Sequence, residues 1–249
     1  MKTKLIALAT MLLFCVVAFP EVAQGQTENI AQGYVHTVQL EMIAQFEEAV
    51  KQHVQWRKQN NDPWEWTWYQ MVNGDGLGTY LVRSGNHRWA DLDVRYAWDD
   101  RVGAAPHFLA TVGPFVESED SSISQLDGVL SRPPDDLSAM TLFTVTEFDV
   151  RLLGQFREAI TKIGEGLDRG NWGRSYLWQM VANGGTTDAT LVVPAENWAA
   201  LAPPEKSLPV VMAEVYGEQE ANELMQQFAS SIRSRNSYTL RVRRDLSLP

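Results

Sequence analysis

The second half of this chain repeats the order of sequence features in the first half, and this duplication limits the available folds more than any other property. An aromatic stretch reads "WYQMVNGDG" in the first half and "LWQMVANGG" in the second. Further shared residues follow in the same order, namely Gln45-Phe46 with Gln155-Phe156, Gln70-Met71-Val72 with Gln179-Met180-Val181, and Trp89-Ala90 with Trp198-Ala199. Because a sequence repeat normally marks a repeated structural unit, we expect each half to form the same series of elements.

Each half has the pattern strand, helix, strand, tight turn, strand, helical region and final strand. Apolar residues at helical spacing predict the first helix of each half, namely Ile43, Phe46, Val50 and Val54, and Leu153, Phe156, Ile160 and Ile163. Asn73-Gly74 and Asn183-Gly184 are typical of hairpin turns between apolar strands. The glycine-rich run at 74–78 joins two strands rather than a strand and a helix, which favours a turn over a phosphate-binding loop.

This βαββαβ order resembles the ferredoxin-like unit of the dimeric α+β barrel superfamily. That superfamily includes antibiotic-biosynthesis monooxygenase-like, NIPSNAP-like and chlorite-dismutase-like proteins, in which two units pack sheet against sheet as a dimer or as a fused tandem. The resemblance implies an α+β fold with two tandem ferredoxin-like repeats, packed as a pseudo-dimeric α+β barrel. Pro133-Pro134 suggests a boundary that gives repeats at 26–134 and 135–249.

The N-terminal segment has the pattern of an export signal. "MKTK" precedes the apolar run 5–19, and Ala23-Gln24-Gly25 fits signal-peptidase cleavage before Gln26. The apolar run is shorter than the roughly 20 residues needed to span a bilayer. We therefore expect a signal peptide at 1–25, no stable membrane anchor after cleavage, and a periplasmic or secreted protein. The single cysteine, Cys15, lies in this segment, so the mature chain would contain no disulfide.

The charge of the chain argues against nucleic acid as a partner. The formal net charge is −10 at pH 7, and the longest basic cluster is "RVRR" at 241–244. Such a chain is repelled by phosphate backbones and by anionic membrane surfaces.

The tryptophan-rich strand suggests a ligand cavity. Trp64, Trp66, Trp68 and Gln70 alternate with residues such as Tyr69, so they share one face of a strand. Both faces are apolar, which favours cover by helices on one side and by the partner sheet on the other. Aromatic residues can fill such an interface or line a cavity for a flat ligand. The candidate ligand-binding residues are Trp66, Trp68, Tyr69, Gln70, Trp178 and Gln179.

The sequence contains no recognisable metal or cofactor motif. All four histidines, His36, His53, His87 and His107, lie in the first half, without the paired spacing of metal sites. His53 occupies a position on the apolar helix face, which predicts a buried, non-catalytic residue. Chlorite-dismutase-like enzymes hold haem through a histidine in the second half, and this chain has none there. We therefore expect no metal site and no cofactor.

The leading hypothesis is an exported, non-catalytic protein that binds a small apolar or aromatic molecule. One alternative is a cofactor-independent monooxygenase-like or isomerase-like enzyme, in which His87, Tyr69 or Gln70 would handle a proton. A further alternative is a structural module that binds a partner protein. Neither the ligand nor the oligomeric state follows from the sequence.

Overall fold

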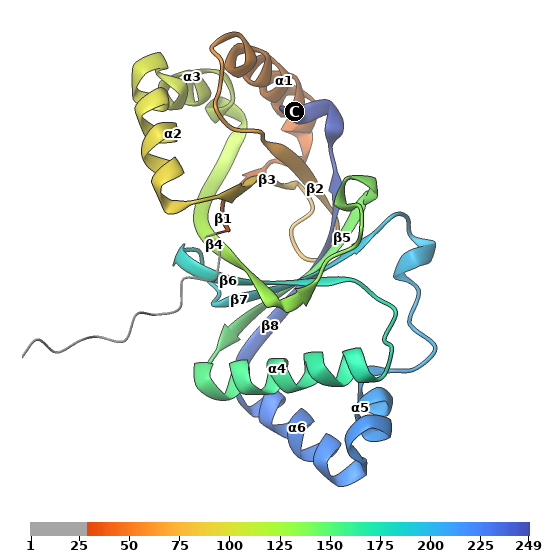
Figure 1. The fold of residues 1–249 in the computed structure, drawn as a ribbon. Helices are drawn as coiled ribbons and strands as arrows, with labels where there is room; N and C mark the ends of the chain where they lie inside the picture. Colours follow the sequence, from red (N-terminus) through yellow and green to blue (C-terminus); the bar gives the residue numbers. More distant parts are fainter. Residues whose placement is uncertain (1–28) are drawn as a thin grey trace, which may run out of the picture.

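The structure is a computed structural model that describes residues 29–249. The predicted signal peptide and its cleavage point lie outside the described residues. The described chain forms a closed barrel of eight antiparallel strands with two groups of α-helices on opposite sides (Figure 1). This arrangement confirms the predicted α+β class.

The two halves have the same element order, as the repeat predicts. The first half contains β1 (Ile30–Val38), α1 (Ile43–Gln59), β2 (Thr67–Asn73), β3 (Thr79–His87), α2 (Trp89–Val102), α3 (Ala104–Thr111) and β4 (Val116–Arg132). The second half contains β5 (Leu142–Val150), α4 (Leu153–Arg169), β6 (Tyr176–Gly184), β7 (Ala189–Ala195), α5 (Leu208–Tyr216), α6 (Glu218–Ser230) and β8 (Ile232–Val242). Short 3₁₀ helices include η3 (Leu137–Ala139) and η5 (Arg244–Leu246).

The strands are ordered β1-β3-β2-β8-β5-β7-β6-β4 around the barrel. Each half therefore contributes four adjacent strands, and the halves join where β2 pairs with β8 and β4 pairs with β6. Helices α1–α3 cover the outside of the first-half strands, and α4–α6 cover the second-half strands (Figure 1). The barrel leaves no open sheet edge to pair with other chains.

Each half buries a phenylalanine of its first helix against a tryptophan of the sheet. Phe46 and Phe156 are both fully buried. Phe46 meets the Trp68 ring edge-on at 5.9 Å, and Phe156 meets Trp178 edge-on at 5.7 Å. These contacts place one aromatic core under each group of helices.

The sequence match of Gln-Met-Val in the two halves gives the wrong register for the second strand. It pairs Trp68 with Leu177, but Leu177 faces the barrel interior, whereas Trp68 faces the helices. The structural counterpart of Trp68 is Trp178, one residue later. A shift of one residue moves every side chain of a strand to the opposite face. Gln70 and Gln179 therefore lie on different faces.

The predicted hairpin turn after β2 is confirmed. Gly74 has φ +120°, and a Cβ at this position would lie 2.6 Å from Cβ of Tyr238. Glycine is the residue that tolerates both the backbone angle and the close approach. The 74–78 segment thus connects β2 to β3 and precedes no helix.

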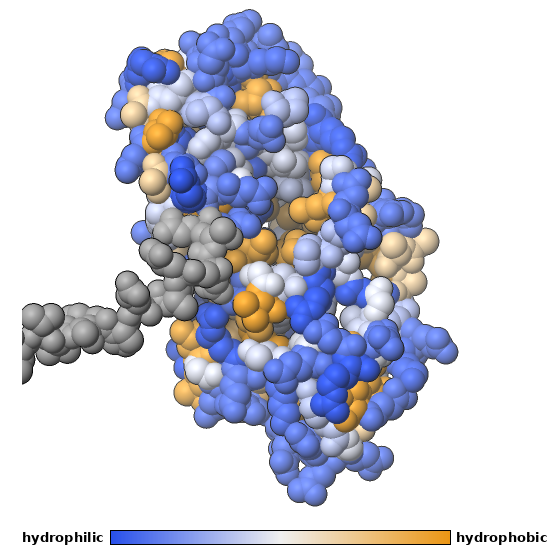
Figure 2. Space-filling view, in the orientation of Figure 1, coloured by the Kyte–Doolittle hydropathy of each residue, from blue (hydrophilic) through white to orange (hydrophobic). Residues whose placement is uncertain are grey.

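The outer surface is largely hydrophilic over both groups of helices, with hydrophobic residues gathered around the middle of the molecule (Figure 2). Within residues 29–249, no helix is both long and apolar enough to cross a membrane.

Candidate functional site

A cavity of about 310 Å³ lies between the outer face of the first-half strands and helices α1–α3. We refer to it as the helix-side pocket. Its aromatic wall comes from Tyr34 and His36 of β1, Trp66 and Trp68 at the start of β2, and Phe108 of α3. Strand alternation brings these β1 and β2 side chains to the same outer face. Such a wall suits a flat, largely apolar molecule.

His36 is the most enclosed polar residue of this wall. It is buried, and its ring centroid lies 5.3 Å from those of both Trp68 and Phe108. Nδ1 lies 3.2 Å from a carboxylate oxygen of Glu119, whose side chain is partly exposed. Neither Nδ1 nor Nε2 has a hydrogen-bond partner among the described residues, although Glu119 lies close to Nδ1. The arrangement leaves one imidazole nitrogen available next to an aromatic cavity, with a carboxylate beside the other nitrogen.

A second histidine of the pocket is held in the neutral form. Nδ1 of His53 lies 2.9 Å from Nδ1 of His107, so one nitrogen of the pair carries the shared proton. Burial, together with the charge of Arg57 and the neighbouring His107, lowers the pKa of His53 to about 3. Its Nε2 is buried without a partner. His53 therefore offers the pocket a neutral imidazole.

Two arginines and an aspartate complete the polar lining. The guanidinium groups of Arg57 and Arg95 lie 5.1 Å and 5.7 Å from the centre of the Trp66 ring. Arg57 is anchored through Nε to Asp62 at 2.5 Å, and Nη1 of Arg95 lies 3.4 Å from Asp99. Nη2 of Arg57, Nε of Arg95 and Oδ1 of Asp99 have no partner among residues 29–249. Positive charge is thus held against the aromatic wall.

Tyr34 adds a hydroxyl that remains protonated. Burial raises the pKa of Tyr34 to about 12, with the Arg95 charge opposing part of this shift. Because buried polar groups are nearly always hydrogen-bonded in native proteins, the unpartnered atoms around this pocket indicate that a polar ligand or ordered water meets them.

The sequence-predicted ligand residues do not form one site. Trp66 and Trp68 line the helix-side pocket. Trp178 is part of the packed core under α4–α6. Tyr69 and Gln179 face a different cavity, inside the barrel. Because strand neighbours point to opposite faces, Trp68 and Tyr69 cannot line the same cavity.

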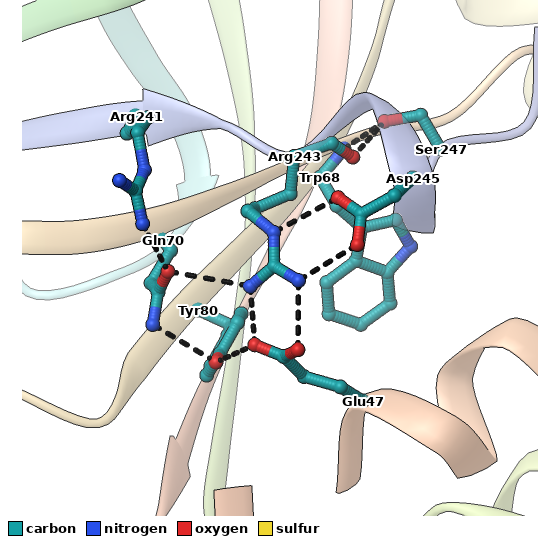
Figure 3. Close-up of polar contacts among 8 residues, drawn as sticks. All are labelled: Glu47, Trp68, Gln70, Tyr80, Arg241, Arg243, Asp245 and Ser247. Atoms are coloured by element: carbon teal, nitrogen blue, oxygen red, sulfur yellow. Dashed lines mark hydrogen bonds and ion pairs between the residues drawn. The ribbon is translucent and has the colours of Figure 1, made fainter. Parts of the chain in front are cut away.

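Gln70 belongs to a polar network near the start of α1 and the end of β8 rather than to a cavity wall (Figure 3). Its amide nitrogen donates to the Tyr80 hydroxyl at 3.0 Å, and its oxygen accepts from Arg241 at 3.2 Å. Tyr80 donates to Glu47 at 2.6 Å, and Arg243 binds the same carboxylate through two nitrogens. The amide is satisfied within the protein, which favours a structural role for Gln70.

The residues proposed to move a proton in the alternative enzyme do not meet in the helix-side pocket either. His87 stacks on Trp64 at 3.7 Å and lies 2.7 Å from the Ser84 hydroxyl. Tyr69 faces the barrel interior, and Gln70 lies in the network just described.

The polar lining residues that the sequence analysis did not include among the ligand-binding candidates are His36, His53, Arg57, Arg95 and Asp99. A signal was present for two of them. His53 interrupts an apolar helix stripe at the position that Ile163 occupies in the second half, and His36 corresponds to Thr146. A polar residue in one half that replaces an apolar or small residue at the same position of the other half indicates that the two halves differ in the environment of this position.

The second half does not fit a haem group. It contains no histidine, and the space under α4–α6 is filled by Phe148, Phe156, Trp178 and Phe228, whose ring centroids lie 5.6–5.9 Å apart. Within the described part of the chain, no group of three or more His, Cys, Asp or Glu side chains could hold a metal ion.

Comparison with known proteins gives structural relatives only. No protein-family model matches the chain, and no curated protein matches its sequence. A structure described as an anthrone oxidase-like protein is similar, with a TM-score of 0.55 and 12% identity, over 90% of this chain and 94% of that one. A proposed monooxygenase from Lactobacillus acidophilus has a TM-score of 0.53 and 10% identity, over 89% of this chain and 96% of that one. A proposed monooxygenase from Fusobacterium nucleatum has a TM-score of 0.53 and 13% identity, over 86% and 92%.

The neighbours correct the leading functional hypothesis. At 10–13% identity they establish a shared ferredoxin-type α+β barrel fold. Their descriptions are those of oxygenases and of an oxidase-like protein, which contradicts the expectation of a non-catalytic binding protein.

Proposed function

We propose that this protein is a monooxygenase-like enzyme that uses O₂ to oxidise a flat, weakly acidic aromatic molecule in the helix-side pocket, without a resident cofactor. The observation that carries the proposal is the pocket itself. Unpartnered polar atoms of His36, His53, Arg57, Arg95 and Asp99 surround a cavity with aromatic walls. A pocket that is largely apolar with a few convergent polar groups is the usual form of a substrate site.

His36 is the proton acceptor in this proposal. It lines the pocket, its Nε2 has no partner, and a carboxylate oxygen of Glu119 lies 3.2 Å from Nδ1. A correctly placed general base contributes typically 10²–10⁴-fold to a rate. His53 is a weaker choice, since its pKa of about 3 leaves it little affinity for a proton.

Arg57 and Arg95 stabilise the substrate anion. Both guanidinium groups lie against Trp66 and retain a nitrogen without a partner. Fixed positive charge in a pocket screened from water stabilises negative charge that develops during a reaction. The electron-rich anion then supplies electrons to O₂. In the net reaction a CH₂ carbon loses two hydrogens and gains a carbonyl oxygen from O₂, while the second oxygen atom leaves as water.

The architecture supports a site in the first half alone. We propose that the chain is a tandem fusion of two ferredoxin-like units, at 26–134 and 135–249, packed as a pseudo-dimeric barrel. The shared element order supports this arrangement. The second unit has a filled aromatic core where the first has the pocket, so its role is to complete the barrel.

The proposal is tested with anthrone, a flat tricyclic molecule with an acidic CH₂ group, in air-saturated buffer. We expect O₂ consumption with formation of the corresponding quinone. Because His36 accepts the proton, His36→Gln should lower kcat by roughly 100-fold. His87→Gln is the matched control, since His87 is outside the pocket, and its rate should equal that of the unchanged protein.

A visible absorption spectrum of the purified protein accompanies the assay. An unchanged rate in His36→Gln would contradict the proposed role of His36. A haem absorption band in the active protein would contradict oxidation without a cofactor.

We also propose that the protein acts outside the cytoplasm, on the basis of the signal-like pattern at 1–25. The intact mass of the protein isolated from its native host should correspond to a chain that starts near Gln26. Recovery of the uncut chain from the membrane fraction would oppose this proposal.

A further inference from the structure

A second cavity, of about 320 Å³, lies inside the barrel, on the opposite face of the strands from the helix-side pocket. We refer to it as the lumen cavity. Exposed polar residues at one end, including Asp120, Ser121 and Asn236, line it as well, so this end is open to solvent. The proposed oxidation does not involve this cavity.

Arg83 of β3 is the cation of the lumen cavity. Its side chain lines the cavity and is partly buried. Neither a hydrogen bond nor an ion pair joins it to another group among residues 29–249, although a guanidinium carries five N–H donors. Burial lowers the pKa of Arg83, and Tyr69 is the only neighbour whose charge opposes this shift.

The acidic groups of the cavity do not neutralise Arg83. Asp120 lies opposite Val35, whereas Arg83 lies opposite Gly33, two residues earlier in β1. Glu147 lies on β5 across the barrel and accepts a hydrogen bond from Tyr238 at 2.8 Å. A buried charge is costly unless it is paired. The lumen thus holds a guanidinium that lacks an anion.

The backbone beside Arg83 leaves room for its side chain. A Cβ on Gly85 would lie 2.9 Å from Nη1 of Arg83 and 3.6 Å from Cβ of Ala31. Arg83 therefore extends over Gly85, toward Ala31 of β1. Ser124 is the partner of Ala31 on β4, and its hydroxyl donates to the Gln179 oxygen at 3.0 Å. This places the Gln179 amide on the same side of the lumen, with its N–H₂ group unused by the described residues.

Part of the cavity wall is apolar, beside polar residues such as Thr79, Ser122 and Thr190. Leu81, Phe143, Leu177, Val192 and Leu240 line it, and most of them form the small core inside the barrel. The lumen therefore combines one unpaired cation with an apolar stretch of wall. A molecule that matches both needs a single negative charge and an apolar body.

We infer that the barrel lumen is a binding site for a small monocarboxylate with an apolar chain or ring, and that Arg83 binds its carboxylate. The Gln179 amide donates a further hydrogen bond, and the apolar wall holds the hydrocarbon part. The cavity size is that of small-molecule sites, which begin at about 300 Å³.

Octanoate is the probe, and 1-octanol is its neutral counterpart of the same chain length. Isothermal titration calorimetry of the full barrel should show that octanoate binds at least roughly tenfold more tightly than octanol. A hydrogen bond to a charged group changes a dissociation constant by on the order of tenfold or more. Arg83→Gln should remove this preference, and Arg83→Lys should retain part of it. Arg235→Gln, at an exposed arginine of β8, is the matched control and should bind like the unchanged protein.

Equal binding of octanol and octanoate, or undiminished octanoate binding by Arg83→Gln, would overturn the inference. If Arg83→Gln fails to fold, carboxyl-¹³C-labelled octanoate bound to the unchanged protein gives the answer by NMR. An ion pair with Arg83 should make the bound carboxylate titrate at lower pH than free octanoate, and a titration that is unshifted or raised would overturn the inference as well.

Discussion

The substitution Phe46→Ala should lower the free energy of unfolding by about 3–5 kcal/mol, the range found when a buried aromatic side chain is removed. Phe46 is fully buried, and its ring contacts those of Tyr80 at 4.8 Å, Trp68 at 5.9 Å and His36 at 6.3 Å. Two contributions make up this loss: the folded variant no longer gains the free energy of burying the ring, and a cavity remains in its place. The neighbouring large rings are held in position by the strands, so they cannot move in to fill the cavity. Urea unfolding followed by tryptophan fluorescence measures it.

Phe156→Ala is the matched substitution in the second half. Phe156 is equally buried, with Trp178, Phe148 and Phe228 around it, so the same loss of stability is expected. Only Phe46 borders the helix-side pocket through His36 and Trp68. At a temperature where both variants are folded, Phe46→Ala should lower the oxidation rate, whereas Phe156→Ala should leave it unchanged. A loss below 1 kcal/mol in either variant would show that the core repacks around the missing ring.

Much of the fold follows from local patterns in the sequence. The apolar stripe that includes Phe46 and Val50 predicts α1, and the matching stripe with Phe156 predicts α4, because both repeat at helical spacing. Asn73-Gly74 predicts the first hairpin for an equally local reason. What fails is the register between the halves, since Gln-Met-Val is identical in both but its faces are set by tertiary packing of Trp68 and Trp178 against the helices.

The site could be predicted from the sequence only in part. Successive side chains of β2 point to opposite faces, so the aromatic residues of this strand divide between two cavities. This alternation places Trp66 and Trp68 in the helix-side pocket and Tyr69 in the lumen cavity. A list of aromatic residues from one strand therefore mixes two cavities. The polar groups come from elements far apart in the chain, such as Arg57 of α1 and Arg95 of α2, and no spacing in the sequence connects them.

The two cavities differ in how their arginines are paired with carboxylates. Around the helix-side pocket the arginines are anchored by nearby carboxylates, Arg57 by Asp62 and Arg95 by Asp99, so their positions are fixed before a ligand arrives. In the lumen Arg83 has no such anchor. A preorganised pair of cations suits stabilisation of a reacting anion, whereas a lone cation suits simple binding of one. This difference separates the proposed catalytic site from the proposed carboxylate site.

His53 should make the protein lose stability in mild acid. Its pKa is about 3 in the folded protein and 6.5 in the unfolded chain. Between these values the unfolded chain binds more protons, so the free energy of unfolding falls as pH drops below 6.5 and the loss is complete only below pH 3. The cause is mainly burial of the imidazole, with Arg57 and His107 opposing protonation further.

Between pH 7 and pH 4.5 this histidine alone should cost roughly 2 kcal/mol, from the linkage between proton binding and folding. His53→Gln removes the titrating group, so urea unfolding at the two pH values should show the unchanged protein losing roughly 2 kcal/mol more than the variant. His87→Gln is the control. The pKa of His87 is also lowered by burial, but its ring is less enclosed than that of His53, so its removal should change the pH dependence less. If His53→Gln and the unchanged protein lost stability in parallel, His53 would have to become protonated within the fold, and the neutral imidazole assigned to the helix-side pocket would be wrong.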